Sequence, residues 1–90
     1  MNIIRKKFTF YGSVQGVGFR YRAYYAAREN NVTGWVKNNY DGSVEMEAEG
    51  EAENIENMLL AIEKGRFVRI ENFVCQAVPV QNSRTFDIIG

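Results

Sequence analysis

The chain has 90 residues, of which 46% are hydrophobic and 13% aromatic, so we expect one core and a single domain over residues 1–90. Eleven basic residues balance eleven acidic ones, which excludes a broad positive field for nucleic acid or an anionic membrane. The absence of histidine and the single Cys75 exclude a disulfide, the usual histidine-based triads and most zinc sites. We expect neither a metal nor a cofactor.

The N-terminal segment predicts a strand rather than a targeting signal. Its basic residues at positions 5–7 precede no long apolar run, so we expect neither a signal peptide nor a membrane anchor, and a cytoplasmic protein. From Lys7 to Val14 apolar and polar side chains alternate, which is typical of a half-buried strand. Its expected inward residues are Phe8, Phe10 and Val14.

A glycine-rich stretch separates this strand from the first predicted helix. Residues 15–18 read Gln-Gly-Val-Gly, and the aromatic and alanine-rich segment 20–29 suits a helix. Asn30 and Asn31 end it, because asparagine tolerates the left-handed conformation at a helix end. We expect the tyrosines of this helix to pack it on a sheet and Arg22 to be solvated; those tyrosines are Tyr21, Tyr24 and Tyr25.

Two further strands flank a tight hairpin. Residues 33–37 predict the second strand, and Asp41-Gly42 supplies the positive φ angles that a hairpin turn requires. In the third strand Val44, Met46 and Ala48 share one face, while the glutamates share the other. We expect that glutamate face, Glu45, Glu47 and Glu49, to be solvated.

The second half of the chain repeats the helix and strand pattern. Ile55, Met58, Leu59 and Ile62 have the spacing of an amphipathic helix that ends at Lys64-Gly65. Residues 68–77 predict a fourth, less regular strand, and residues 85–89 a short last one. The order predicts an α+β fold, a split βαβ sandwich whose two helices cover one face of an antiparallel sheet. The expected inward residues of the fourth strand are Ile70, Phe73 and Cys75.

The segment 12–20, Gly-Ser-Val-Gln-Gly-Val-Gly-Phe-Arg, is the first candidate site. Glycines let the backbone approach an anion, and N–H groups at a helix start can converge on its oxygens. The guanidinium of Arg20 can donate two parallel hydrogen bonds to a phosphate. The loop alone is a weak signal, because it matches neither the dinucleotide fingerprint nor the phosphate loop that ends in Gly-Lys-Ser/Thr.

The segment 34–44, Gly-Trp-Val-Lys-Asn-Asn-Tyr-Asp-Gly-Ser-Val, is the second candidate. Asn38 ends the second predicted strand, and an asparagine before an Asp-Gly turn is more often a turn former than a catalyst. Because the first and second strands of a split βαβ unit run the same way, we expect Asn38 and the glycine loop at one edge of the sheet.

Together the two segments resemble the acylphosphatase family. The first matches its Gly-x-Val-Gln-Gly-Val-x-Phe-Arg signature and the second its Gly-Trp-Val-x-Asn-x-x-x-Gly-x-Val signature. The resemblance covers essentially the whole chain and implies a ferredoxin-like fold and hydrolysis of acyl phosphates without a metal. It also implies that Asn38 orients the attacking water. The phosphoryl group would bind Arg20 and the backbone of Gln15, Gly16, Val17, Gly18 and Phe19.

The chemistry of an acyl phosphate suits such a site. Its carboxylate leaving group has a low pKa and needs no general acid, and the loose transition state asks mainly for positioning and positive charge. We expect a monomer with a small-molecule substrate, inorganic phosphate as product inhibitor, and no nucleic-acid or membrane partner. Topology further suggests that the Gly90 carboxylate ends at the same edge of the sheet as Arg20 and pairs with its guanidinium.

Two alternatives remain at this point. The first is a non-catalytic or accessory anion-binding domain of the same fold, of the kind found in carbamoyl-transfer maturation proteins, because fold alone does not prove activity. The second is an RNA-binding module that uses the basic residues 5–7 beside Phe8 and Phe10. Neutral overall charge and the acidic third strand disfavour the second alternative.

The link at residues 65–67 lacks the proline often seen in the family.

Overall fold

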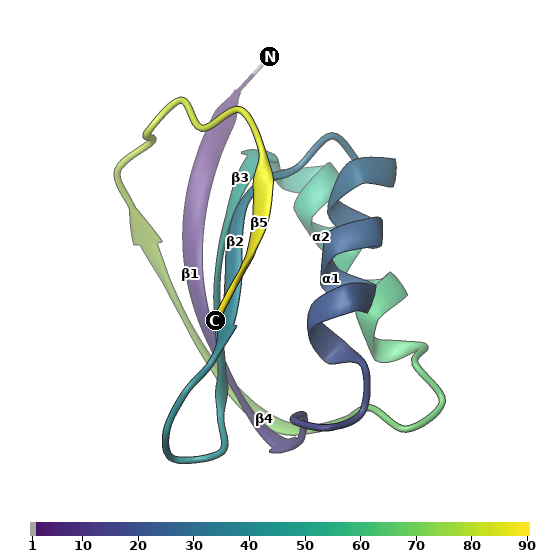
Figure 1. The fold of residues 1–90 in the computed structure, drawn as a ribbon. Coiled ribbons are helices and arrows are strands. Elements are labelled where there is room, and N and C mark those ends of the chain that lie inside the picture. The colour runs from purple at the N-terminus through teal and green to yellow at the C-terminus, as the bar shows by residue number, and fades with distance from the viewer. Residues whose placement is uncertain (1) are drawn as a thin grey trace.

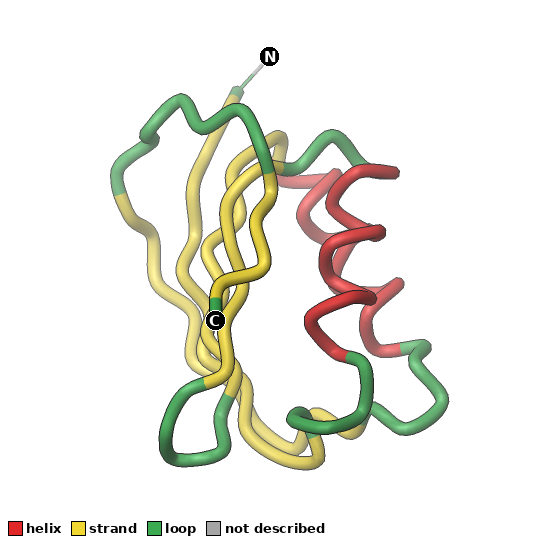
Figure 2. The backbone as a smooth tube through the Cα atoms, in the orientation of Figure 1, coloured by secondary structure: helices red, strands yellow, loops and turns green. Residues whose placement is uncertain are grey.

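The structure is a computed structural model that describes residues 2–90 (Figure 1). Within these residues the chain forms five strands and two helices, which pack as a sheet with both helices on one face (Figure 2). Neither helix has the length and apolar character that crossing a membrane requires. In chain order the elements are β1 (Ile3–Ser13), α1 (Phe19–Glu29), β2 (Thr33–Asn38), β3 (Val44–Glu51), α2 (Ala52–Glu63), β4 (Arg69–Val78) and β5 (Phe86–Ile89).

The sheet has the strand order β4-β1-β3-β2-β5. The first four strands pair antiparallel, as predicted, and β5 adds a parallel pair with β2 at the far edge. The predicted split βαβ sandwich with a short C-terminal strand is therefore confirmed, although the sheet is mixed rather than fully antiparallel. Because β1 and β2 both run antiparallel to β3, they end at the same edge of the sheet.

The core lies between the sheet and the helices. Its sheet side includes Phe8, Phe10, Val36 and Met46, each 2% exposed or less. Helix α1 contributes Phe19 and three alanines to this core, and α2 contributes three apolar side chains, all on one face of each helix. Burial of Phe8 and Phe10 beneath the helices removes the aromatic sheet surface that the RNA hypothesis required. The helix residues are Phe19, Ala23, Ala26, Ala27, Ile55, Met58 and Ile62.

The prediction that the tyrosines pack α1 on the sheet is wrong for two of them. Tyr21 and Tyr25 are 65% and 61% exposed, whereas Tyr24 is half-buried and packs against the core. The reason is the helical period: the side chains at 19, 23, 26 and 27 already form the buried face, and positions 21 and 25 lie elsewhere on the helix.

The prediction that Cys75 is buried is also wrong. Cys75 is exposed and Phe73 is 49% exposed, because β4 is an edge strand that α2 does not fully cover. A hollow of about 200 Å³ remains between α2 and the β1–β4 pair. The irregular pattern of β4 comes from a break in register, where Phe10 pairs with Phe73 but Gly12 pairs with Ile70, so a β-bulge lies between them.

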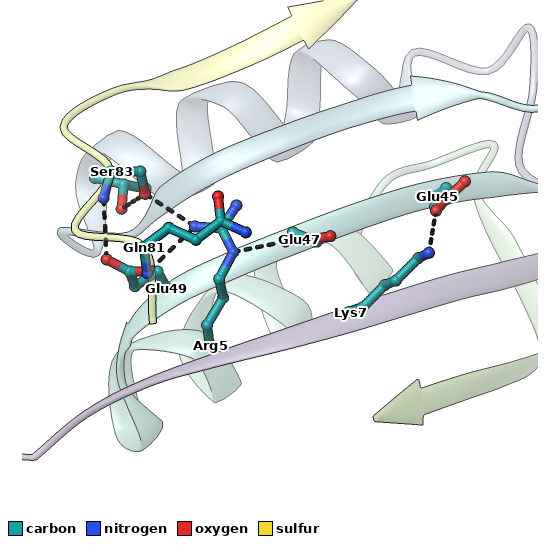
Figure 3. Close-up of polar contacts among 8 residues, drawn as sticks. Arg5, Lys7, Glu45, Glu47, Glu49, Gln81 and Ser83 are labelled. Atoms are coloured by element: carbon teal, nitrogen blue, oxygen red, sulfur yellow. Dashed lines mark hydrogen bonds and ion pairs between the residues drawn. The ribbon is translucent and has the colours of Figure 1, made fainter. Parts of the chain in front are cut away.

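The glutamate face of β3 is only partly solvated, contrary to expectation. The connector from β4 to β5 crosses the uncovered face of the sheet, where Glu49 is 5% and Arg5 2% exposed (Figure 3). Arg5 Nε donates to Glu47 Oε1 at 2.6 Å, and its Nη1 donates to Glu49 Oε1 at 3.1 Å. The backbone amides of Gln81 and Ser83 donate to the Glu49 carboxylate at 2.7 and 3.1 Å. The connector is thus fastened to the sheet by a buried ion pair.

Three loops meet at the other end of the molecule, which we call the glycine-loop end. They are the β1–α1 loop at residues 14–18, the β2–β3 hairpin at residues 39–43 and the α2–β4 link at residues 64–68, all at the bottom of Figure 1. The connector from β4 to β5 lies at the top of that view, at what we call the opposite end.

Candidate active site

The glycine loop connects β1 to α1, and no side chain among residues 2–90 caps the backbone amides at the start of α1. Val14, 1% exposed, anchors the start of the loop in the core. Gly16 and Gly18 adopt left-handed φ angles of 73° and 81°, which favour glycine. Gly18 is the N-cap of α1 without a side-chain hydrogen bond, and the first turn carries no acidic residue. The positive end of the helix and its first amides therefore lie open to an anion.

Arg20 and Asn38 line the same cavity. This cavity of about 200 Å³ is also lined by Gly16, Gly18 and Phe19, so it joins the loop to the end of β2. Arg20 is half-buried, and none of the salt bridges among residues 2–90 involves it. Its charge is available to a ligand, and the neutral amide group of Asn38 lines the same hollow.

Two of the expected phosphate-site residues do not line this cavity. Val17 packs partly against the core and lines a neighbouring groove. The Gln15 side chain turns to the β2–β3 hairpin, where its Nε2 donates to the carbonyls of Asn39 at 2.8 Å and Ser43 at 2.9 Å. Gln15 thereby ties the glycine loop to the hairpin that carries Asn38.

The hairpin itself is held by several short-range hydrogen bonds. The Asn39 amide donates to the Ser43 carbonyl at 2.8 Å, and the Ser43 amide donates to Asp41 Oδ1 at 3.0 Å. The Ser43 hydroxyl and amide lower the pKa of Asp41 below its ordinary value, because both donate to the carboxylate. Asn38 therefore sits at the base of a rigid turn.

Sequence reasoning missed Val14 and Tyr21 as lining residues of the cavity. Tyr21 directly follows Arg20 and remains exposed, so its place at the mouth follows from the helical position rather than from any motif. The expected ion pair between Arg20 and Gly90 is not among the salt bridges of residues 2–90, although β5 runs toward this edge beside β2. Within the same residues, no three or more Cys, Asp or Glu side chains are grouped as a metal ion would require.

A larger hollow, about 530 Å³, lies near the other end of α1 and is lined by Arg28, Asn31, Arg84 and Thr85 among others. It contains neither the glycine loop nor a helix start. The amides and the guanidinium that suit a phosphoryl group are found in the smaller cavity, so we assign the candidate site to that cavity.

The fold defines a ferredoxin-like domain, and the cavity is a candidate anion site at a helix start. The sequence model of the acylphosphatase family matches residues 6–88. The acylphosphatase of Clostridium acetobutylicum is 45% identical over 80 residues, which cover 87% of this chain and 88% of that protein. The crystal structure of the Bacillus subtilis acylphosphatase superposes with a TM-score of 0.89 at 30% identity, covering 99% of this chain and 100% of that one.

A longer protein also contains this fold. Full-length HypF, in a phosphate- and nucleotide-bound form, matches with a TM-score of 0.89 at 31% identity, but the match covers only 12% of its chain. The family model and the curated relatives together place the chain in one family. The chain belongs to the acylphosphatase family and is a hydrolase of acyl phosphates.

Proposed function

We propose that Arg20 and the amides of the glycine loop bind the phosphoryl group of the acyl phosphate, and that Asn38 orients the attacking water. The observation that carries this proposal is the shared cavity of Arg20, Asn38 and the loop glycines. The guanidinium and the start of α1 supply positive charge where negative charge gathers on the phosphoryl oxygens. Asn38 supplies a carbonyl oxygen that can accept a hydrogen bond from water.

The reaction requires no more than these groups. Water adds its oxygen to phosphorus while the bond between phosphorus and the acyl oxygen breaks, and the electron pair leaves on the carboxylate. The proton that water loses passes to a phosphate oxygen or to solvent, because the carboxylate is a weak base and needs none. We therefore propose that turnover needs no metal ion and that alkyl phosphates, whose leaving groups are far more basic, are poor substrates.

The proposal extends to the domain organisation, oligomeric state, location and product inhibition of the protein. We propose that residues 1–90 act as one domain, that the protein is a cytoplasmic monomer, and that inorganic phosphate inhibits by occupying the Arg20 cavity. Inhibition by the product follows from the site, because the same donors that bind the transferred group bind free phosphate.

The test is steady-state hydrolysis of benzoyl phosphate in the presence of a chelator, with inorganic phosphate as inhibitor. Turnover that survives chelation and is inhibited competitively by phosphate supports the proposal. Hydrolysis of an alkyl phosphate at a comparable rate would contradict the leaving-group argument.

A second candidate is an accessory anion-binding role, which the similarity to a small part of HypF favours. In that case the Arg20 cavity would bind phosphate without hydrolysis. Phosphate binding detected by calorimetry, in a protein that does not hydrolyse benzoyl phosphate, would support this second role.

A further inference from the structure

A groove rich in exposed aromatic side chains lies beside the candidate active site. We define the aromatic groove by Tyr21, Arg22, Tyr25, Arg66 and Phe67, which line a hollow of about 340 Å³ between α1 and the α2–β4 link. Phe67 is 66% exposed, and the two tyrosines are exposed to a similar degree. These three large aromatic side chains lie together on one surface, and none of them is in the core. A contiguous exposed patch of this kind is typical of a binding surface, whereas a single exposed apolar residue is not.

The groove is continuous with the phosphoryl site. Gly18 and Tyr21 line both the Arg20 cavity and the aromatic groove. Both lie at the glycine-loop end, where the start of α1 and the α2–β4 link are neighbours (Figure 1). A substrate whose phosphoryl group is held at Arg20 can therefore extend its other part past Tyr21 into the groove.

The groove is positively charged in a protein without net charge. Arg22 and Arg66 line it, and no Asp or Glu does. A Cβ added at Gly65 would come within 2.7 Å of Arg22 Cδ and Nε, so the Arg22 side chain lies directly against the link backbone. The Arg66 guanidinium carbon lies 5.4 Å from the centroid of the Phe67 ring, a cation–π contact. Neither arginine takes part in a salt bridge among residues 2–90.

These side chains define the chemistry of the ligand. Aromatic faces and planar guanidinium groups stack on planar rings, and free guanidinium groups pair with carboxylates. A hollow of this size has room for a substituted ring. We propose that the aromatic groove binds the acyl part of the substrate and selects acyl phosphates whose acyl group is a planar ring with an additional carboxylate. This inference rests on the proposed function of the Arg20 cavity.

The test compares three substrates that differ only in the acyl group: acetyl phosphate, benzoyl phosphate and 4-carboxybenzoyl phosphate. Differences in intrinsic reactivity cancel when each substrate is compared between wild type and variant. Phe67→Ala is expected to lower the preference of kcat/KM for benzoyl over acetyl phosphate by about tenfold, because stacking on one ring contributes on the order of 1–3 kcal/mol. Phe67→Leu keeps an apolar side chain without the ring face and is expected to recover only part of the preference.

The charge is tested with Arg22→Gln combined with Arg66→Gln. This double variant is expected to lower the preference for 4-carboxybenzoyl over benzoyl phosphate by about five- to tenfold, mostly through KM. Arg84→Gln removes an exposed arginine that lines the hollow near the other end of α1 and is the matched control. The inhibition constant of inorganic phosphate, which occupies only the Arg20 cavity, should differ little between all these proteins.

Equal substrate preferences in wild type, the Phe67 variants and the double arginine variant would overturn the acyl-group assignment. A protein that hydrolyses none of the three substrates would instead contradict the proposed function. In that event the groove is tested by binding, using acetylphosphonate, benzoylphosphonate and 4-carboxybenzoylphosphonate in calorimetric titrations. Tighter binding of the carboxylated ring, lost in the double variant, supports the groove, and equal affinities for the three phosphonates would overturn it.

Discussion

In the described part of the chain, polar groups are paired with one another at one end of the sheet and left unpaired at the other. At the opposite end, Arg5, Glu47 and Glu49 satisfy one another and hold the connector from β4 to β5 on the sheet (Figure 3). At the glycine-loop end, Arg20 has no salt bridge among residues 2–90, and the first amides of α1 have no side-chain cap. Charges paired within the protein stabilise the fold, whereas charges left open to a cavity are available to a ligand.

Removal of the open charge should produce the largest loss of activity and little loss of stability. Arg20→Gln is expected to lower kcat/KM for benzoyl phosphate by about a thousandfold, because one charged donor to the transition state is lost. It should also weaken inhibition by phosphate by at least about tenfold. The measurement is steady-state kinetics with a thermal melt of each protein. A variant that binds phosphate as wild type does would contradict the role of Arg20.

Removal of the Asn38 amide should affect turnover but not phosphate affinity. Asn38→Ala is expected to lower kcat by about a hundredfold, since water is no longer positioned, while the phosphate inhibition constant changes by less than about threefold. Asn72→Ala, an exposed asparagine of β4, is the control. Near-full turnover in the Asn38 variant would rule out its proposed role in positioning water.

The buried pair at the opposite end should affect stability alone. Glu49→Gln is expected to reduce the free energy of unfolding by about 2 kcal/mol at neutral pH. This loss is smaller than that for breaking an isolated buried ion pair, because Arg5 still pairs with Glu47. The kcat of the folded variant should stay close to that of wild type. Glu63→Gln, an exposed glutamate, is the control for charge alone.

The difference in stability between wild type and Glu49→Gln should depend on pH, in a direction that the pKa of Glu49 fixes. Burial raises the pKa of Glu49, but the Gln81 amide, the Arg5 guanidinium and the Ser83 amide together hold it below its ordinary value of 4.5. The stabilisation is therefore complete above that ordinary value and is lost as the pH falls through the lower pKa of the folded state. Denaturant melts of wild type and Glu49→Gln should converge in acid; a constant difference at every pH would contradict this account.

The smallest effect should come from the hydrogen bonds that join the glycine loop to the hairpin. Gln15→Ala leaves the carbonyls of Asn39 and Ser43 without the Gln15 donor and is expected to lower kcat about five- to tenfold by loosening Asn38, at a stability cost of about 1–2 kcal/mol. Gln15→Glu keeps the length of the side chain but removes the donor and should behave alike. Wild-type kcat in both variants would show that the link does not position Asn38.

The elements with strong periodicity were predictable from the sequence. Alternation in β3 placed Val44, Met46 and Ala48 in the core, and the spacing of Ile55, Met58 and Ile62 defined the buried face of α2. The same rule, applied to positions 19, 23, 26 and 27, would have identified the buried face of α1. The bulk of the tyrosines masked that signal, because Phe19 and three small alanines fill the interface instead.

Other features depend on contacts that no local pattern encodes. Glu49 alternates with buried residues as any solvated glutamate would, and it is buried only because residues 79–85 return across β3. Arg20 and Asn38 were found through motifs, but the bond from Gln15 to Asn39 joins segments far apart in the sequence. The groove beside Phe67 was not predicted, since exposure of an aromatic residue depends on which neighbours the fold provides.

The position of β1 between β4 and β3 in the sheet has a consequence for how the protein forms. Its residue Ile3 pairs with Glu51 and Arg5 with Val78, so β1 pairs only with strands that are synthesised well after it. Such distant pairings are slow to close, because the intervening chain must lose its freedom before any contact repays that loss. Until then Phe8 and Phe10 stay uncovered, so we expect synthesis to pass through a stage in which the nascent chain depends on chaperones or on rapid collapse.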